Sequence, residues 1–161
     1  MHLRLGPPDG NHLVLRPLRR SHPGAEGFWD GNWLKVAVEA RGGAFAGRFE
    51  ADLRADELAA FAAALGALRP GEPARVALES TEGWVSVRLA LDDRGRLEGT
   101  VEVRDDPGLG AALRYPLAVE LGQLPGLLAA LQAILHAFPV VGSPEAEGGV
   151  LLADEDGPGD A

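Results

Sequence analysis

The chain has 161 residues, of which 46% are hydrophobic and 24% charged, so it is long enough for one globular domain and its composition excludes a mainly disordered or fibrous protein. It has no cysteine, which excludes disulfides, thiolate metal sites and a thiol nucleophile. It also has neither a signal peptide nor a run of about 18 apolar residues, so we expect a cytosolic protein that does not enter membranes. Six of its 24 acids follow Val141, where no Lys or Arg occurs, and the nearly balanced remainder disfavours binding to nucleic acid, which requires clustered bases.

Alternation of apolar and polar residues predicts strands in the first half of the chain. The first covers residues 12–20, and its Pro17, which cannot donate to a strand ladder, is expected at an edge or a bulge. Residues 21–32 contain one proline and three glycines and are expected to form a loop. Residues 33–40 and 45–53 then alternate around a glycine-containing turn, so we expect an antiparallel hairpin.

Two helices are predicted from apolar residues spaced three and four positions apart. The first has Asp56 and Glu57 in its first turn and Pro70 beyond its end. The second begins near Pro125 and ends at Pro139. The stripes consist of Leu58, Phe61, Ala62, Leu65 and Leu68 in the first helix, and of Leu124, Leu127, Leu128, Leu131, Ile134, Leu135 and Phe138 in the second. We expect both stripes to be buried.

The remaining alternating segments complete a fold prediction. They are residues 75–80, 84–91, 96–104 and 113–121. Strands and helices come in blocks, which disfavours a doubly wound parallel sheet. We therefore expect an α+β fold, a two-layer sandwich of one mostly antiparallel sheet with both helices packed on one face. This domain would span residues 1–141, and residues 142–161 would form an acidic, Pro/Gly-rich tail in which residues 150–152 add a short edge strand.

No catalytic, cofactor or metal site is predicted. The four histidines are scattered, and no serine stands in a Gly-x-Ser-x-Gly nucleophile turn. Ser21 and His22 are adjacent, so in an extended chain they point to opposite sides. The only lysine, Lys35, follows no phosphate-binding glycine loop. Carboxylates such as Glu98 and Glu102 alternate with arginines, which favours cross-strand ion pairs over an acid and base pair.

Two tryptophans give the candidate partner-binding site. The alternation puts Trp33 and Trp84 on the polar face of the sheet, with three charged residues. The predicted site consists of Trp33, Trp84, Arg48, Arg88 and Glu50. Exposed tryptophan beside arginine is typical of the residues that dominate binding energy in protein interfaces. The alternative is that the 21–32 loop covers both tryptophans and forms a minor core with them.

Several short blocks resemble those of WapI-type immunity proteins, bacterial antitoxins that neutralise contact-delivered toxins. The blocks are Leu13-Val14-Leu15-Arg16-Pro17-Leu18, Trp29-Asp30-Gly31-Asn32-Trp33-Leu34, Asp56-Glu57-Leu58 with Phe61, Glu82-Gly83-Trp84, and Phe138-Pro139-Val140 with Gly142. The resemblance implies binding to a toxin without catalysis, and it carries over no active-site residue.

The sequence therefore favours a non-enzymatic cytosolic domain that binds a protein partner, which the resemblance identifies with a toxin. We expect no cofactor. The alternative is a small enzyme or a ligand carrier whose pocket no motif signals.

Overall fold

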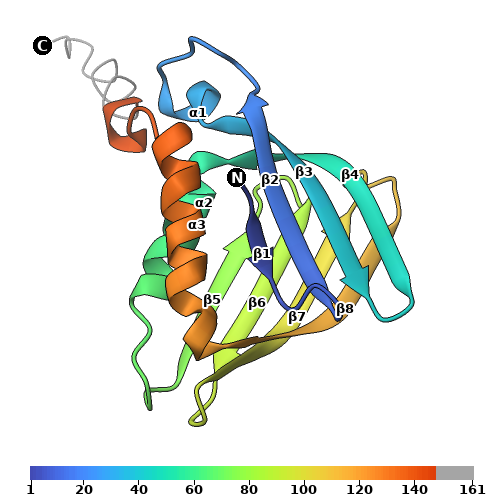
Figure 1. Ribbon diagram of the computed structural model, residues 1–161. Helices are drawn as coiled ribbons and strands as arrows, with labels where there is room; N and C mark the ends of the chain where they lie inside the picture. Colours follow the sequence, from blue (N-terminus) through green and yellow to red (C-terminus); the bar gives the residue numbers. More distant parts are fainter. Residues whose placement is uncertain (148–161) are drawn as a thin grey trace, which may run out of the picture.

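The chain forms two four-stranded antiparallel sheets that face each other (Figure 1). The computed structural model describes residues 1–147. The first sheet has the order β1-β2-β3-β4 and contains Leu3–Leu5, His12–Arg20, Trp33–Gly42 and Phe45–Arg54. The second has the order β5-β6-β7-β8 and contains Ala74–Glu79, Val85–Leu91, Arg96–Arg104 and Ala112–Glu120. Each sheet is a simple meander, because every strand pairs with its neighbour in sequence.

The prediction of one sheet with two helices on one face is wrong. The strands lie where the alternation predicts them, but within residues 1–147 β5 pairs only with β6 and so begins a new sheet after the first predicted helix. Alternation determines which face of a strand is apolar and leaves its pairing partners open. Two apolar faces are thus available, and each sheet buries its own against the other.

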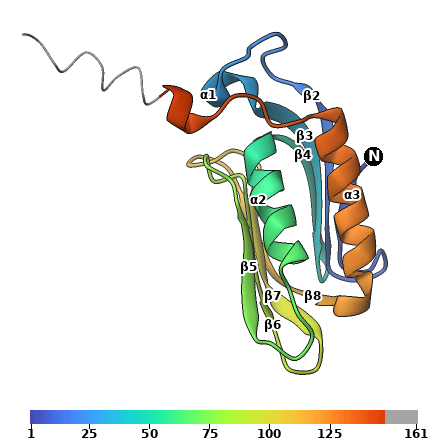
Figure 2. The ribbon, with the colours of Figure 1, turned by 90° about the vertical axis from the view of Figure 1, so that its left-hand side faces the viewer.

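Helices α2 (Ala55–Gly66) and α3 (Leu124–Ala137) close one flank of this sandwich, which faces the viewer in Figure 2. Helix α2 packs against β5 and α3 packs against β1, and the two helices also contact each other. The short helix α1 (Phe28–Gly31) lies within the predicted loop, and a single 3-10 turn, η1 (Leu121–Gln123), precedes α3. None of the helices in residues 1–147 is long and apolar enough to cross a membrane.

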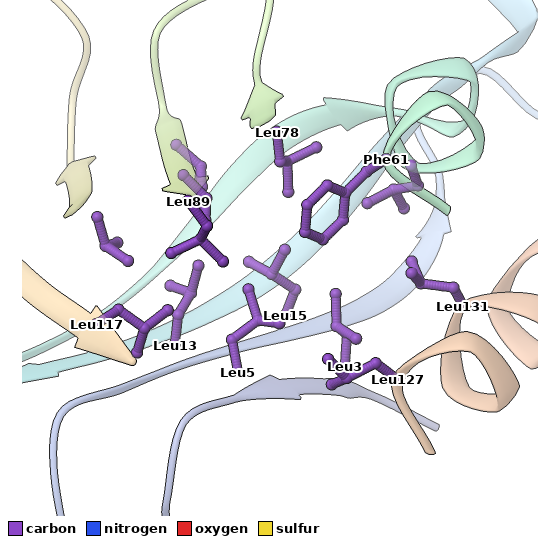
Figure 3. Packing of buried hydrophobic residues seen from close by; sticks show 14 of the residues in the cluster. Leu3, Leu5, Leu13, Leu15, Phe61, Leu78, Leu89, Leu117, Leu127 and Leu131 are labelled. Atoms are coloured by element: carbon purple, nitrogen blue, oxygen red, sulfur yellow. The ribbon is translucent and has the colours of Figure 1, made fainter. Parts of the chain in front are cut away.

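One hydrophobic core fills the space between the sheets and the helices (Figure 3). Leu15 projects into it from the first sheet and Leu89 from the second. Phe61 of α2 and Leu131 of α3 are both fully buried, so the predicted burial of the helical stripes is confirmed at these positions. The helices pack against the edges of two sheets instead of the face of one.

The two sheets approach each other closely where β3 ends and β8 passes. The Tyr115 hydroxyl donates a hydrogen bond of 2.8 Å to the carbonyl oxygen of His12. A Cβ atom on Gly42 would lie 2.5 Å from the Tyr115 Cβ, so glycine is required for this approach. The contact joins β8 to β2 and β3 at the end of the sandwich opposite α1 (Figure 1).

Several local predictions can be compared directly. The register of β2 shifts between Pro17 and Arg19, so the predicted bulge is confirmed. The strand β1 and the helix α1 were not predicted, since three and four residues are too few for a periodic pattern. The predicted edge strand at residues 150–152, and most of the predicted tail, lie outside the described residues.

Candidate partner-binding site

The five predicted site residues do not share one face. Arg48 and Glu50 lie on β4 of the first sheet, whereas Arg88 lies on β6 of the second. Trp33 begins β3, and Trp84 immediately precedes β6. Because the prediction assumed a single sheet, it placed residues of two outer faces together.

Trp84 contributes to the packing between the sheets. Its ring stacks on Phe49 of β4 with 6.3 Å between ring centroids and an interplanar angle of 20°. The indole N–H donates to the Glu82 carboxylate at 3.3 Å. The residue is half-buried and packs against the core. Arg88, by contrast, is exposed, and its ion pair with Glu79 raises the pKa of its guanidinium.

Trp33 is half-buried and connects to the 21–32 segment through a neighbouring side chain. The link is Arg54, the last residue of β4, which lies opposite Trp33 in the sheet register. Its guanidinium carbon is 5.0 Å from the centre of the Trp33 ring, 5.0 Å from that of Phe28 and 5.4 Å from that of Trp29. Three aromatic rings from β3 and α1 thus surround one cation.

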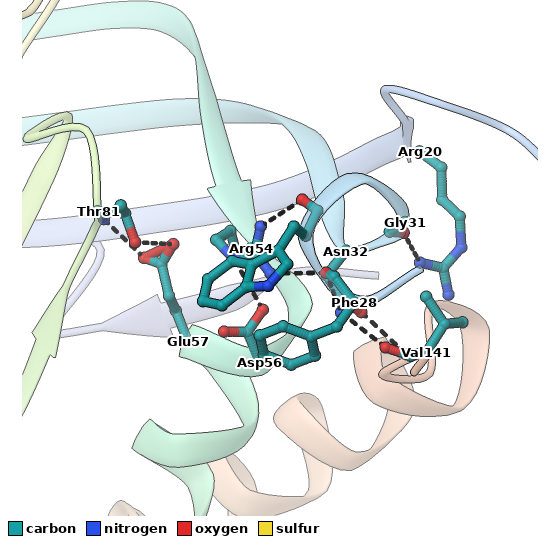
Figure 4. A network of polar contacts seen from close by, with 10 residues as sticks. Arg20, Phe28, Gly31, Asn32, Arg54, Asp56, Glu57, Thr81 and Val141 are labelled. Carbon is teal, nitrogen blue, oxygen red and sulfur yellow. Dashed lines mark hydrogen bonds and ion pairs between the residues drawn. The ribbon is translucent and has the colours of Figure 1, made fainter. Parts of the chain in front are cut away.

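Arg54 also has hydrogen-bond partners for all three of its nitrogens, although only 3% of the residue is exposed (Figure 4). Its Nε donates to Asp56 at 3.0 Å, and its Nη atoms donate to the carbonyl oxygens of Trp29 at 2.7 Å and Phe28 at 2.8 Å. These carbonyls belong to α1, whose short length leaves them without helical partners. Arg54 therefore fixes α1 to the end of β4.

Asn32 fixes α1 to the segment that follows α3 (Figure 4). The side chain is fully buried. Its Nδ2 donates to the carbonyl oxygens of Phe28 and Val141, and its Oδ1 accepts from the Val141 N–H, each at 2.9 Å. Arg20 adds hydrogen bonds to the carbonyl oxygens of Gly31 and Pro139. The family-like blocks around Trp29 and Phe138 are therefore joined in space.

The first turn of α2 carries a carboxyl group that is held away from water. Glu57 accepts hydrogen bonds from the Thr81 N–H at 3.2 Å and from the Thr81 hydroxyl at 3.4 Å. Desolvation by burial raises the pKa of Glu57 to about 7. This contact joins α2 to the turn between β5 and β6.

The surface of the molecule around α1 combines an exposed tryptophan with carboxylates. Trp29 is 56% exposed, although its ring rests against Phe28 at 5.0 Å and against Arg54. The segments that meet here carry Glu26, Asp30, Asp56, Glu145 and Glu147. We call Trp29 and these five acids the α1 surface. The prediction missed Trp29 because it assigned this residue to the covering loop; its place beside Asp30 in the quoted block was the available signal.

A hollow of about 430 Å³ lies next to Trp33. It is lined by Arg19, Ser21, His22, Trp33, Lys35, Asp52 and Glu82. Lys35 and Asp52 form an ion pair of 2.6 Å across β3 and β4. The buried Ser21 hydroxyl has no hydrogen-bond partner within the described part of the chain, so it is not bonded to His22. The described residues contain no group of three or more potential metal ligands.

Comparison with solved structures gives distant likenesses. The crystal structure of WHY1 from Arabidopsis thaliana is 13% identical, with 96% of this chain and 92% of that chain covered and a TM-score of 0.46. WHY3 from the same plant is 15% identical, with 96% and 95% covered and a TM-score of 0.46. The plant transcriptional regulator PBF-2 is 11% identical, with 100% and 90% covered and a TM-score of 0.47. Likeness at this level indicates neither function nor partner.

Comparison with protein families gives a clear result. No curated protein matches the chain. The model of the immunity protein WapI-like family, however, matches residues 4–139, which include strands β2 to β8, all but the first residue of β1, and the helices α1, α2 and α3. The chain therefore belongs to the WapI-like immunity protein family.

Proposed function

We propose that this chain is a cytosolic immunity protein, which neutralises a toxin by binding it and has no catalytic activity of its own. Membership of the WapI-like family is the observation that carries the proposal. A protein with this role needs a rigid surface complementary to its partner and no reactive group. The two facing sheets supply such a scaffold.

We place the toxin contact at the α1 surface. Trp29 presents a large ring to solvent, and tryptophan is enriched among residues that dominate binding energy. Its backbone carbonyl and its ring both contact the buried Arg54, so the ring is held before binding and loses little freedom on contact. The surrounding carboxylates favour a positively charged partner surface.

The function can be tested in two steps. Tagged protein captures partners from a lysate of the source cells, and each captured protein is then expressed alone in a bacterial host. The proposal expects one captured protein to arrest growth and co-expression of this chain to restore it. If no captured protein is toxic, or if co-expression leaves growth arrested, the chain is not an immunity protein for any of them.

The surface can be tested with one substitution once the toxin is in hand. Trp29→Ala should weaken toxin binding by at least tenfold, equivalent to about 1.4 kcal/mol, and should change the free energy of unfolding by no more than about 1 kcal/mol. Leu109→Ala is the matched control, since Leu109 is 90% exposed in the turn between β7 and β8. Equal affinity of the two variants would remove the α1 surface from the interface while leaving the function intact.

A further inference from the structure

The edge of β4 is open, whereas the other sheet edges are protected. β1 has three residues and packs against α3, and β5 has six and packs against α2. β8 contains Pro116, whose carbonyl oxygen accepts a hydrogen bond of 2.9 Å from Asn11. β4 has ten residues and no proline. A long edge without proline is a template for pairing with another strand.

The free side of β4 has no partner in the described part of the chain. Its residues pair only with β3, and no backbone hydrogen bond joins residues 45–53 to another described segment. Phe45, at the start of the strand, is 71% exposed. Figure 1 shows β4 at the border of its sheet, with no strand or helix of that sheet beyond it.

The charged side chains on the outer face of β4 are complementary to those of a second, antiparallel copy of the same strand. Arg48 and Glu50 stand two residues apart on the same face, one position on either side of Phe49. The Arg48 side chain is 81% exposed and lies 3.5 Å from Glu39, and within residues 1–147 no ion pair holds Glu50. If two β4 strands pair antiparallel about a two-fold axis at Phe49, Arg48 of each copy lies opposite Glu50 of the other.

We propose that β4 pairs with β4 of a second copy of this chain, antiparallel and centred on Phe49, so that two first sheets join into one continuous sheet. In this register, Gly47 of one copy lies opposite Ala51 of the other, and Phe45 lies opposite Leu53. Small residues thus face each other beside the Phe49 pair, and the exposed Phe45 ring is covered.

Sedimentation equilibrium of the full chain measures the pairing. We expect a dimer, and we expect Glu50→Arg to raise its dissociation constant by about tenfold or more, because two Arg–Glu pairs become Arg–Arg pairs. Combining Arg48→Glu with Glu50→Arg should restore the wild-type value, since it exchanges the charges and keeps them complementary. Circular dichroism verifies that each variant is folded. A wild-type monomer at about 100 µM, or a double variant as weak as Glu50→Arg, would overturn the proposal.

The register has its own test, because the chain contains no cysteine. Phe49→Cys brings two thiols together at the two-fold axis, so mild oxidation should give a disulfide-linked dimer on a non-reducing gel. Phe45→Cys is the control on the same strand. Its thiols would be eight residues apart along the paired strands, or roughly 26 Å, and should not link. Linking of Phe45→Cys but not of Phe49→Cys would exclude this register.

Discussion

The Asn32 side chain and the backbone of Val141 form a reciprocal pair of hydrogen bonds, each 2.9 Å long, between residues 109 positions apart in sequence. The same amide group also donates to Phe28, whose carbonyl oxygen has a second donor in Arg54. We expect Asn32→Ala to lower the free energy of unfolding by at least about 2 kcal/mol, since it leaves the N–H and the carbonyl oxygen of Val141 without this partner. Urea denaturation measures the loss.

Asn11 offers a matched control for this substitution. It also bonds to backbone groups distant in sequence, Gly43 and Pro116, but both contacts are exposed to water. Asn11→Ala should therefore cost less than about 1 kcal/mol. Similar losses for both variants would contradict the special role of the buried amide.

A substitution at Arg54 tests whether the hydrogen-bond geometry of its guanidinium or its positive charge alone holds α1 in place. Arg54→Lys keeps a positive charge but cannot donate to Asp56, Phe28 and Trp29 from a planar fork. We expect it to lower the free energy of unfolding by about 2–4 kcal/mol and to change tryptophan fluorescence, because the guanidinium lies over two indole rings. The same exchange at the exposed Arg48 should change neither quantity. A silent Arg54→Lys would mean that charge alone holds α1.

Glu57 predicts a pH dependence of stability. The pKa of Glu57 is about 7 in the folded chain, against an ordinary value of 4.5, so folding favours the protonated carboxyl group. The contribution of Glu57 to the free energy of unfolding is fully present below pH 4.5 and is lost as the pH rises through 7. Relative to Glu57→Gln, which stays neutral, the wild type should thus become less stable between pH 5 and pH 8. Urea titrations at several pH values measure this difference, and Glu72→Gln, at an exposed site, should follow the wild type. If the free energy of unfolding of the wild type and of Glu57→Gln changes with pH in parallel, Glu57 is not the source of the pH dependence.

The sequence predicted local structure well because alternation and helical spacing reflect burial directly. Val36 and Val38 face the core as their pattern requires, and so does Phe61. Sheet membership could not be predicted in the same way, since nothing in residues 74–79 indicates that β5 pairs with β6 and with no other strand of the described chain. That pairing decided the fold class.

The candidate site was harder to predict for two reasons. Trp84 follows Gly83, which has a φ of 82°, so the alternation of β6 does not extend to this tryptophan and its ring reaches Phe49 instead of the outer face. Arg54 continues the polar positions of β4, and its burial depends on α1, a helix too short to predict. Tertiary contacts, which no local pattern encodes, determine both positions.

The core prediction concerns Phe61, which lies between the two sheets and is fully buried. Phe61→Ala should lower the free energy of unfolding by about 3–5 kcal/mol, through lost burial and the cavity left behind. Ala63→Gly, at an exposed position of the same helix, should cost about 1 kcal/mol by helix propensity alone. Thermal or urea unfolding compares the two. Equal losses would mean that the core relaxes around the missing ring.

The final prediction concerns the stack of Trp84 on Phe49, because it decides between packing and partner binding for Trp84. If the ring stabilises the contact between the sheets, Trp84→Ala should lower the free energy of unfolding by about 1–3 kcal/mol, and Trp84→Phe, which keeps an aromatic ring, should cost less. Combining Trp84→Ala with Phe49→Ala should give a coupling energy of about 0.5–1.5 kcal/mol in a double-mutant cycle. Additive losses, together with weaker toxin binding by Trp84→Ala, would instead return Trp84 to the partner-binding site that its sequence position first indicated.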